Sequence, residues 1–137
     1  MLPTLLLGGG FMKKFFIDDY QIEKAYEDSQ NDCLWRIRSL KDPSSEFAIH
    51  VAHSGQMYIT HFPGSNIPFK VRVALFKTLC EYLQKQGYSL SIKIINRNQS
   101  LKNFCLAAGF KYKSHGHGPK KSYGIRHDKD FTIYYLP

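Results

Sequence analysis

The chain is poor in cysteine and has no long apolar run. Its cysteines, Cys33, Cys80 and Cys105, are scattered, and none belongs to a Cys-x-x-Cys pair. This odd and dispersed set argues against a disulfide framework and against a zinc knuckle, and it favours a reducing compartment, so we expect a cytoplasmic protein. No apolar run approaches the ~18–20 residues that span a bilayer, and we therefore expect no membrane association.

Familiar catalytic signatures are also missing. No P-loop lysine motif, Ser-His-Asp set or local pair of carboxylates stands out. His115 and His117 flank a glycine, but no third metal ligand is fixed nearby, so we predict a solvated loop over 114–130 and no metal site. Three other histidines lie on or beside predicted strands, namely His50, His53 and His61. Each is either a base near a cleft or, more commonly, a hydrogen-bonded structural residue.

Positive charge is what the sequence has in excess. Its 137 residues include 19 Lys and Arg against 11 Asp and Glu, a net charge of +8. Acidic residues crowd the first part of the chain, so the excess lies mostly after residue 32, and basic residues dominate from Lys111 onward. A basic surface of this kind favours nucleic acid, a phosphate-rich ligand or an acidic protein as partner.

The length suits one domain with a core of ordinary size. Residues 1–11 are apolar, but they have no preceding positive charge and no small-residue cleavage site, which argues against a signal peptide. A second, more ordinary beginning follows at Met12. We therefore interpret 1–11 as an extension or arm and 12–137 as the domain.

Strands are predicted where large apolar residues alternate with polar ones over short runs. These runs are 13–17, 34–40, 47–52, 56–62, 89–95, 110–113 and 131–136. After the first run, Asp18 or Asp19 is expected to cap a helix to about Gln30, because acidic residues crowd its first turn and Ile22 and Tyr26 share a face.

The chain is organised around residues 56–110. Ser65 or Asn66 is expected to cap a long helix over 68–86 that has Pro68 in its early turn and stops at Gly87. Its predicted buried face recurs at about one helical turn, through Val71, Leu75, Leu79 and Leu83. A short second helix is expected over 101–108, opened by Asn98 and Ser100 and closed by Gly109.

This unit resembles the core of the GNAT family of N-acetyltransferases. In that family a strand leads through a phosphate-binding turn into a long helix, a second strand splays away, and a short helix ends in an Asn-(about ten residues)-Gly-Phe pattern. Asn98, Gly109 and Phe110 stand at that spacing. The resemblance covers residues 46–114 and implies a single α/β (α+β) domain with a mixed, mainly antiparallel sheet and flanking helices.

The resemblance also implies acyl transfer from acetyl-CoA to an amine. The positions implied to bind the cofactor are Ile59, Thr60 and His61 for the pantetheine arm, Asn66, Lys70 and Arg72 for the pyrophosphate, and Asn98 for the acyl end. Cys105 stands where the family usually has its general acid, a Tyr four residues before the Gly. A thiol of ordinary pKa, about 8.5, can protonate a leaving thiolate, whereas a buried Cys is more often a small hydrophobe.

The chain departs from the family in the acyl-CoA loop, Gln/Arg-x-x-Gly-x-Gly/Ala, whose glycines let the backbone approach a pyrophosphate. Aligned by the helix, that loop is 67–72, where Lys70 and Arg72 replace both glycines and Pro68 has no N–H to donate. The two basic residues either pair with phosphates or form a solvated helix start. We predict weak, salt-dependent binding of acetyl-CoA.

A closer likeness is to the small GNAT-like internal virion proteins of T7-like short-tailed phages. They share the degraded loop, an apolar residue in place of the Tyr, and a terminal strand like 131–136. This likeness implies an alternative function, that of a non-catalytic binding protein of a bacteriophage, in the host cytoplasm or the virion. Its basic C-terminal region would contact an acidic protein or nucleic acid.

Overall fold

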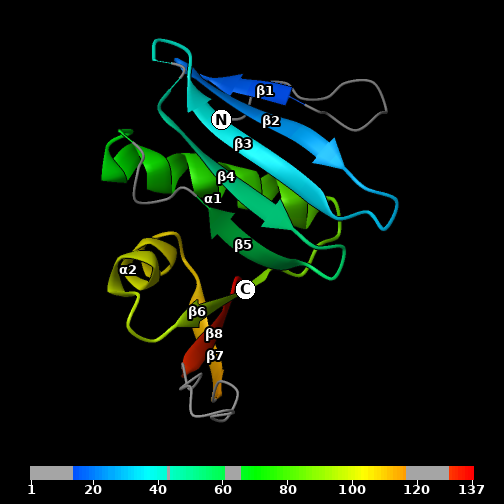
Figure 1. The fold of residues 1–137 in the computed structure, drawn as a ribbon, viewed down its shortest axis with the longest axis vertical. Coiled ribbons are helices and arrows are strands. Elements are labelled where there is room, and N and C mark those ends of the chain that lie inside the picture. The colour runs from blue at the N-terminus through cyan, green and yellow to red at the C-terminus, as the bar shows by residue number, and fades with distance from the viewer. Residues whose placement is uncertain (1–13, 43, 61–65, 117–129) are drawn as a thin grey trace, which may run out of the picture.

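The computed structural model describes residues 14–42, 44–60, 66–116 and 130–137. Their strands form one eight-stranded sheet in the order β1-β2-β3-β4-β5-β6-β8-β7 (Figure 1). The elements are β1 (Lys14–Ile17), β2 (Tyr20–Glu27), β3 (Cys33–Ser39), β4 (Glu46–Val51), β5 (Gln56–Thr60), α1 (Phe69–Lys85), β6 (Ser91–Ile95), α2 (Gln99–Ala107), β7 (Lys111–Gly116) and β8 (Phe131–Tyr135).

The sheet is mixed and mainly antiparallel, as predicted. Strands β1 to β5 form a run of antiparallel neighbours, and β8 pairs antiparallel with both β6 and β7. Of the described strand pairs, only β5 and β6 are parallel, and the crossover helix α1 connects them. The predicted single α/β domain with flanking helices is thereby confirmed.

The predicted helix from Asp18 or Asp19 to Gln30 is wrong. That segment is β2, and the two aspartates form the turn of a hairpin in which Ile17 pairs with Tyr20. Asp18 adopts a φ of 52°, a conformation that Asp tolerates in turns better than most residues. Ile22 pairs with a buried residue on each neighbouring strand, so tertiary pairing overrides the local helical signal.

Helix α1 packs its apolar face beneath the sheet. Leu75, Leu79 and Leu83 are buried as predicted, and Val71 is partly buried. The helix begins after Pro68, which serves as N-cap with no side-chain hydrogen bond, so the expected cap at Asn66 is wrong. Ser65, the alternative cap, and residues 61–62 of the predicted strand lie outside the described residues.

Both helices end on a glycine in the left-handed region. Gly87 has a φ of 99° and Gly109 a φ of 100°. The N–H of Tyr88 reaches back to the carbonyl of Leu83 over 3.1 Å, and that of Phe110 to Cys105 over 3.0 Å, which is the Schellman arrangement. The predicted helix stops are therefore confirmed.

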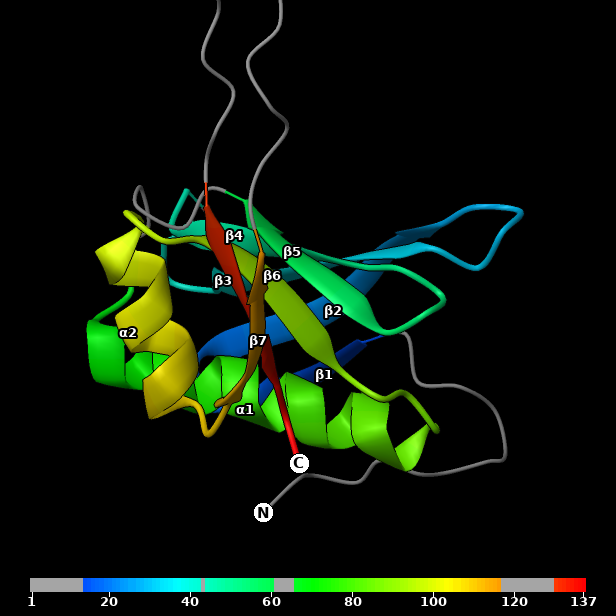
Figure 2. The ribbon, with the colours of Figure 1, turned by 90° about the horizontal axis from the view of Figure 1, so that it is seen from below.

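The two helices lie on the same face of the sheet (Figure 2). Phe104 of α2 contacts Phe47 of β4 and Phe76 of α1, with ring centroids 6.1 Å and 5.0 Å away. Phe110 was expected to open a strand, but it is buried against Phe76, and β7 begins only at Lys111. No helix of the described residues covers the opposite face.

Candidate functional site

Strands β5 and β6 pair over a short ladder and then diverge. Their parallel ladder consists of Gln56 with Ser91 and Met57 with Ile92. Beyond it, β5 continues to Thr60 on the side of β4, while β6 continues to Ile95 on the side of β8 (Figure 1). Within the described part of the chain, the edge of β5 that faces β6 is therefore unpaired from residue 58 to residue 60. This divergence of the two strands is called the splay below.

The positive end of α1 lies at the same edge of the sheet. The first intrahelical donor is the N–H of Arg72, which bonds the Pro68 carbonyl over 2.9 Å. The amides of residues 69–71 precede it and have no acceptor within the helix. The first turn contains no acidic residue. Backbone donors and the helix dipole therefore favour an anion here.

The two basic side chains of this turn differ in their surroundings. Lys70 is exposed. Arg72 donates from Nε to the Ile67 carbonyl over 2.8 Å, and its guanidinium lies 5.6 Å from the Phe69 ring centroid and 6.0 Å from that of Phe104. Burial lowers the pKa of Arg72. The structure thus ties Arg72 to the helix start and leaves the Lys70 ammonium facing solvent.

The remaining predicted cofactor positions are spread around this edge. The side chain of Ile59 is buried, Thr60 ends β5, and Asn66 is exposed just before α1. His61 lies outside the described residues. Asn98 caps α2, because its Oδ1 accepts the N–H of Leu101 over 3.2 Å.

Cys105, the predicted acid, is fully buried in α2. Burial raises the pKa of its thiol to about 12, so the thiol stays protonated at neutral pH. Its apolar surroundings include Cys80, whose pKa burial also raises well above its ordinary value. Because the thiol is fully enclosed, the role of a small hydrophobe fits this position better.

Sequence reasoning missed the sheet face that no described helix covers, and it missed a pocket at the C-terminal end of α1. Both follow from the hairpin of β2 and β3, which replaced the expected helix. The signal that could have found this hairpin is that Tyr20 and Ile22 alternate with the polar residues Gln21 and Glu23.

Among the described residues, no three His, Cys, Asp or Glu side chains gather in a way that would hold a metal ion. The same residues contain no helix with the length and apolar character needed to cross a membrane.

No protein-family model and no curated protein matches this sequence. Solved structures do match its fold. One is assigned as an acetyltransferase from Sphaerobacter thermophilus, with a TM-score of 0.59, 13% identity, and coverage of 91% of this chain and 99% of that one. Another is assigned to the GNAT acetyltransferases of Chromobacterium violaceum, with a TM-score of 0.60, 12% identity, and coverage of 99% and 95%.

The fold is that of the GNAT acetyltransferases. In GNAT terms, β5, α1 and β6 are the strand, the long helix and the splaying strand, and α2 is the short helix that ends at Gly109 and Phe110. Neither neighbour is named as a virion protein, so the phage likeness stays a prediction.

Proposed function

We propose that this protein is an acyl-CoA-dependent N-acyltransferase that works by positioning its reactants. The observation that carries the proposal is the splay of β5 from β6 at the positive end of α1. An unpaired strand edge offers amide and carbonyl groups to a pantetheine arm, and a helix N-terminus offers donors to a phosphate.

The described residues fit the pantetheine arm of acyl-CoA better than its phosphate end. The edge from residue 58 to residue 60 suits the pantetheine arm, because nothing in the described chain occupies its hydrogen-bonding groups. The phosphate end is weaker, since Pro68 contributes no N–H and Arg72 is already committed to Ile67. Lys70 is exposed, so its attraction for a phosphate is reduced by salt.

When bound, acyl-CoA supplies an activated thioester whose acyl group can pass to an amine. The chain's own contribution is to orient that group along β5 and to hold the anionic end at residues 69–71. We assign no acid role to Cys105 in this proposal, because its thiol is buried and its pKa is about 12. The leaving thiolate is then protonated by solvent or by the amine that attacks.

Calorimetry with acetyl-CoA in low and physiological salt tests the proposal. We expect a Kd above ~100 μM at physiological salt and tighter binding in low salt, because micromolar affinity needs about 8 kcal/mol and each exposed charge contributes about 1. Lys70→Ala should weaken low-salt binding several-fold. Lys77→Ala, which removes an exposed charge from the middle of the same helix, should not.

Turnover is followed by the release of CoA thiol in the presence of a panel of amines, and Cys105→Ala should retain it. Binding without thiol release would remove the enzyme assignment and leave a CoA-binding protein. No binding at either salt concentration would overturn the proposal entirely. Salt-independent micromolar binding would show that the backbone cradle survives the loss of both glycines.

A non-catalytic binding protein is the second candidate, favoured by the enclosed thiol of Cys105 and by an exposed basic strand. Residues 111–115 of β7 are exposed, and they include Lys111 and Lys113. This candidate predicts contact with an acidic protein or nucleic acid, and a virion is one setting for it. Charge reversal at both lysines should weaken binding to a fluorescent oligonucleotide, whereas reversal at Lys14 and Lys41 should have little effect.

A further inference from the structure

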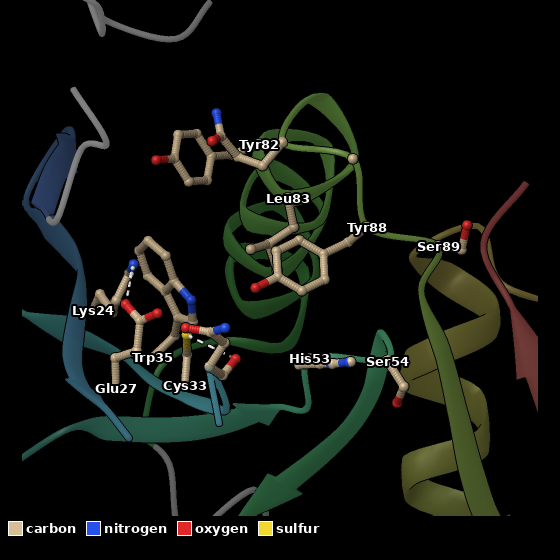
Figure 3. Close-up of a pocket in the computed structure, with 13 residues that line it drawn as sticks. Lys24, Glu27, Cys33, Trp35, His53, Ser54, Tyr82, Leu83, Tyr88 and Ser89 are labelled. Atoms are coloured by element: carbon tan, nitrogen blue, oxygen red, sulfur yellow. Dashed lines mark hydrogen bonds and ion pairs between the residues drawn. The ribbon is translucent and has the colours of Figure 1, made fainter. Parts of the chain in front are cut away.

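A pocket lies at the opposite end of α1 from the proposed acyl-CoA site, about 25 Å away along the helix. Its volume is about 580 Å³, which is within the range of small-molecule sites. Three turns enclose it: the β2–β3 turn, the β4–β5 turn and the loop that follows α1 (Figure 3). Nothing in the proposed acyl transfer uses this pocket.

The described residues in and beside the pocket include two carboxylates, those of Glu27 and Asp32, against the one ammonium group of Lys24, although the chain as a whole is positive. Glu27 lines it, and Asp32 lies at its rim, where Oδ1 accepts the N–H of His53 over 2.8 Å. The carbonyl end of α1 also points here, and the negative end of a helix dipole attracts cations. Burial raises the pKa of Tyr88, and Cys33, Glu27 and Asp32 add to that shift.

An ammonium group already occupies part of this environment. Nζ of Lys24 lies 3.0 Å from Oε1 of Glu27 and 5.9 Å from the centroid of the Trp35 ring (Figure 3). Tyr82 packs edge-on against Trp35 at 5.7 Å, and Tyr88 lies across the pocket from them. Aromatic rings beside a carboxylate are the combination that recognises organic cations.

A buried hydrogen-bond donor without a partner is a second feature of the pocket. The indole nitrogen of Trp35 is buried and has no hydrogen-bond partner, and Trp35 itself is 1% exposed. Figure 3 shows this nitrogen on the side of the ring that faces Cys33 and Tyr88, both of which line the pocket. Buried donors are rarely left without a partner, so an acceptor on a bound ligand would complete the site.

We propose that this pocket binds a small organic cation that also carries a hydrogen-bond acceptor, that is, a molecule of the amino-alcohol class. The ammonium group of the ligand shares the carboxylate of Glu27 with Lys24 and faces the neighbouring aromatic rings. The acceptor, a hydroxyl or carbonyl oxygen a few bonds away, faces the indole N–H of Trp35.

Choline and dimethylbutanol, its uncharged isostere in which carbon replaces nitrogen, test this proposal. Trp35 is the single tryptophan of the chain, so its fluorescence reports the pocket directly. We expect choline to give a saturable change in that fluorescence and dimethylbutanol to bind about tenfold more weakly. An equal response to both compounds, or a response to neither, would overturn the proposal.

Glu27→Gln removes the carboxylate, and it should fold normally because the Glu27 side chain is 41% exposed. We expect it to weaken choline binding about fivefold or more. Glu81→Gln is the matched control, since it removes one exposed carboxylate of α1 that does not line the pocket. Equal losses in both variants would mean that net charge, and not the site, attracts the cation, and would also overturn the proposal.

Discussion

The thiol of Cys105 is enclosed by the core, and burial raises its pKa from an ordinary value of about 8.5 to about 12. Between these values the unfolded chain loses the thiol proton and the native chain keeps it. The free energy of unfolding should therefore fall as the pH rises above 9, by about 1.4 kcal/mol per pH unit from this group, and be unaffected by it below pH 8.

Urea melts of the wild type and of Cys105→Ala between pH 8 and pH 10.5 measure this contribution. The variant should be less stable at pH 8, because it loses buried volume. The difference in the free energy of unfolding between the two proteins should shrink as the pH rises, because the variant lacks the titrating thiol. A constant difference between the two proteins across this range would show that Cys105 titrates normally in the folded state.

Leu79 is fully buried in the middle of α1. Leu79→Ala should lower the free energy of unfolding by about 2–5 kcal/mol, through lost burial and a residual cavity. Lys77→Ala, at an exposed position of the same helix, should change it by less than about 0.5 kcal/mol. Denaturant melts compare the two, and a loss below about 1 kcal/mol for Leu79→Ala would contradict the assigned face.

At the scale of elements, most strands and both helices could be predicted because their own residues carry the signal. The one-turn spacing from Val71 to Leu83 and the glycines at 87 and 109 are local facts, and the structure agrees with them. The segment after Asp18 could not be predicted in this way. Its strand conformation depends on pairing with β1 and β3, which a local pattern does not contain.

The candidate site depends even more on relations between elements. The sequence suggested that Lys70 and Arg72 were equivalent, but the Ile67 carbonyl and two aromatic rings distinguish them. Asn98 was predicted to line the acyl end from its spacing to Gly109 and Phe110, but the same position is that of a helix cap, and its side chain caps α2. The splay itself is set by where the β5–β6 ladder stops, and no residue type marks that point.

Gly55 and Gly87 distinguish two costs of replacing a glycine in a turn, the conformational penalty and the steric clash of the added Cβ. Both have positive φ, 95° and 99°. A Cβ at Gly87 meets nothing within 4 Å, so Gly87→Ala should cost only the conformational penalty of about 1–2 kcal/mol. A Cβ at Gly55 would lie 2.0 Å from the carbonyl oxygen of Ser89, so that backbone would have to move.

Gly55→Ala should therefore be more destabilising than Gly87→Ala by at least about 2 kcal/mol, since it also disturbs the bond from Ser91 N–H to the Gly55 carbonyl. That bond joins β5 to β6 just before they diverge, so the same variant should weaken any ligand bound in the splay. Urea melts give the stability difference. Equal losses would mean that the approach of Gly55 to Ser89 is not required by the fold.

At the scale of the whole molecule, the splay raises the question of what keeps the two parts of the sheet together. Among the residues that the structure describes, strands β1 to β5 and strands β6 to β8 are paired only through the short β5–β6 ladder. Phe104 spans this division, because it lies on α2, which follows β6, and it contacts Phe47 of β4 and the Phe69 and Phe76 rings of α1. The buried residues of both parts belong to one core cluster.

A core that is continuous across the splay predicts one cooperative unfolding unit. Phe104→Ala should lower stability by about 3–5 kcal/mol and should accelerate amide exchange equally at Trp35 in β3 and at Tyr134 in β8. Leu106→Ala, at an exposed position of the same helix, should leave both rates nearly unchanged. If Phe104→Ala accelerated exchange in β8 but not in β3, the two parts would be separate folding units, and the splay could open without unfolding the rest of the sheet.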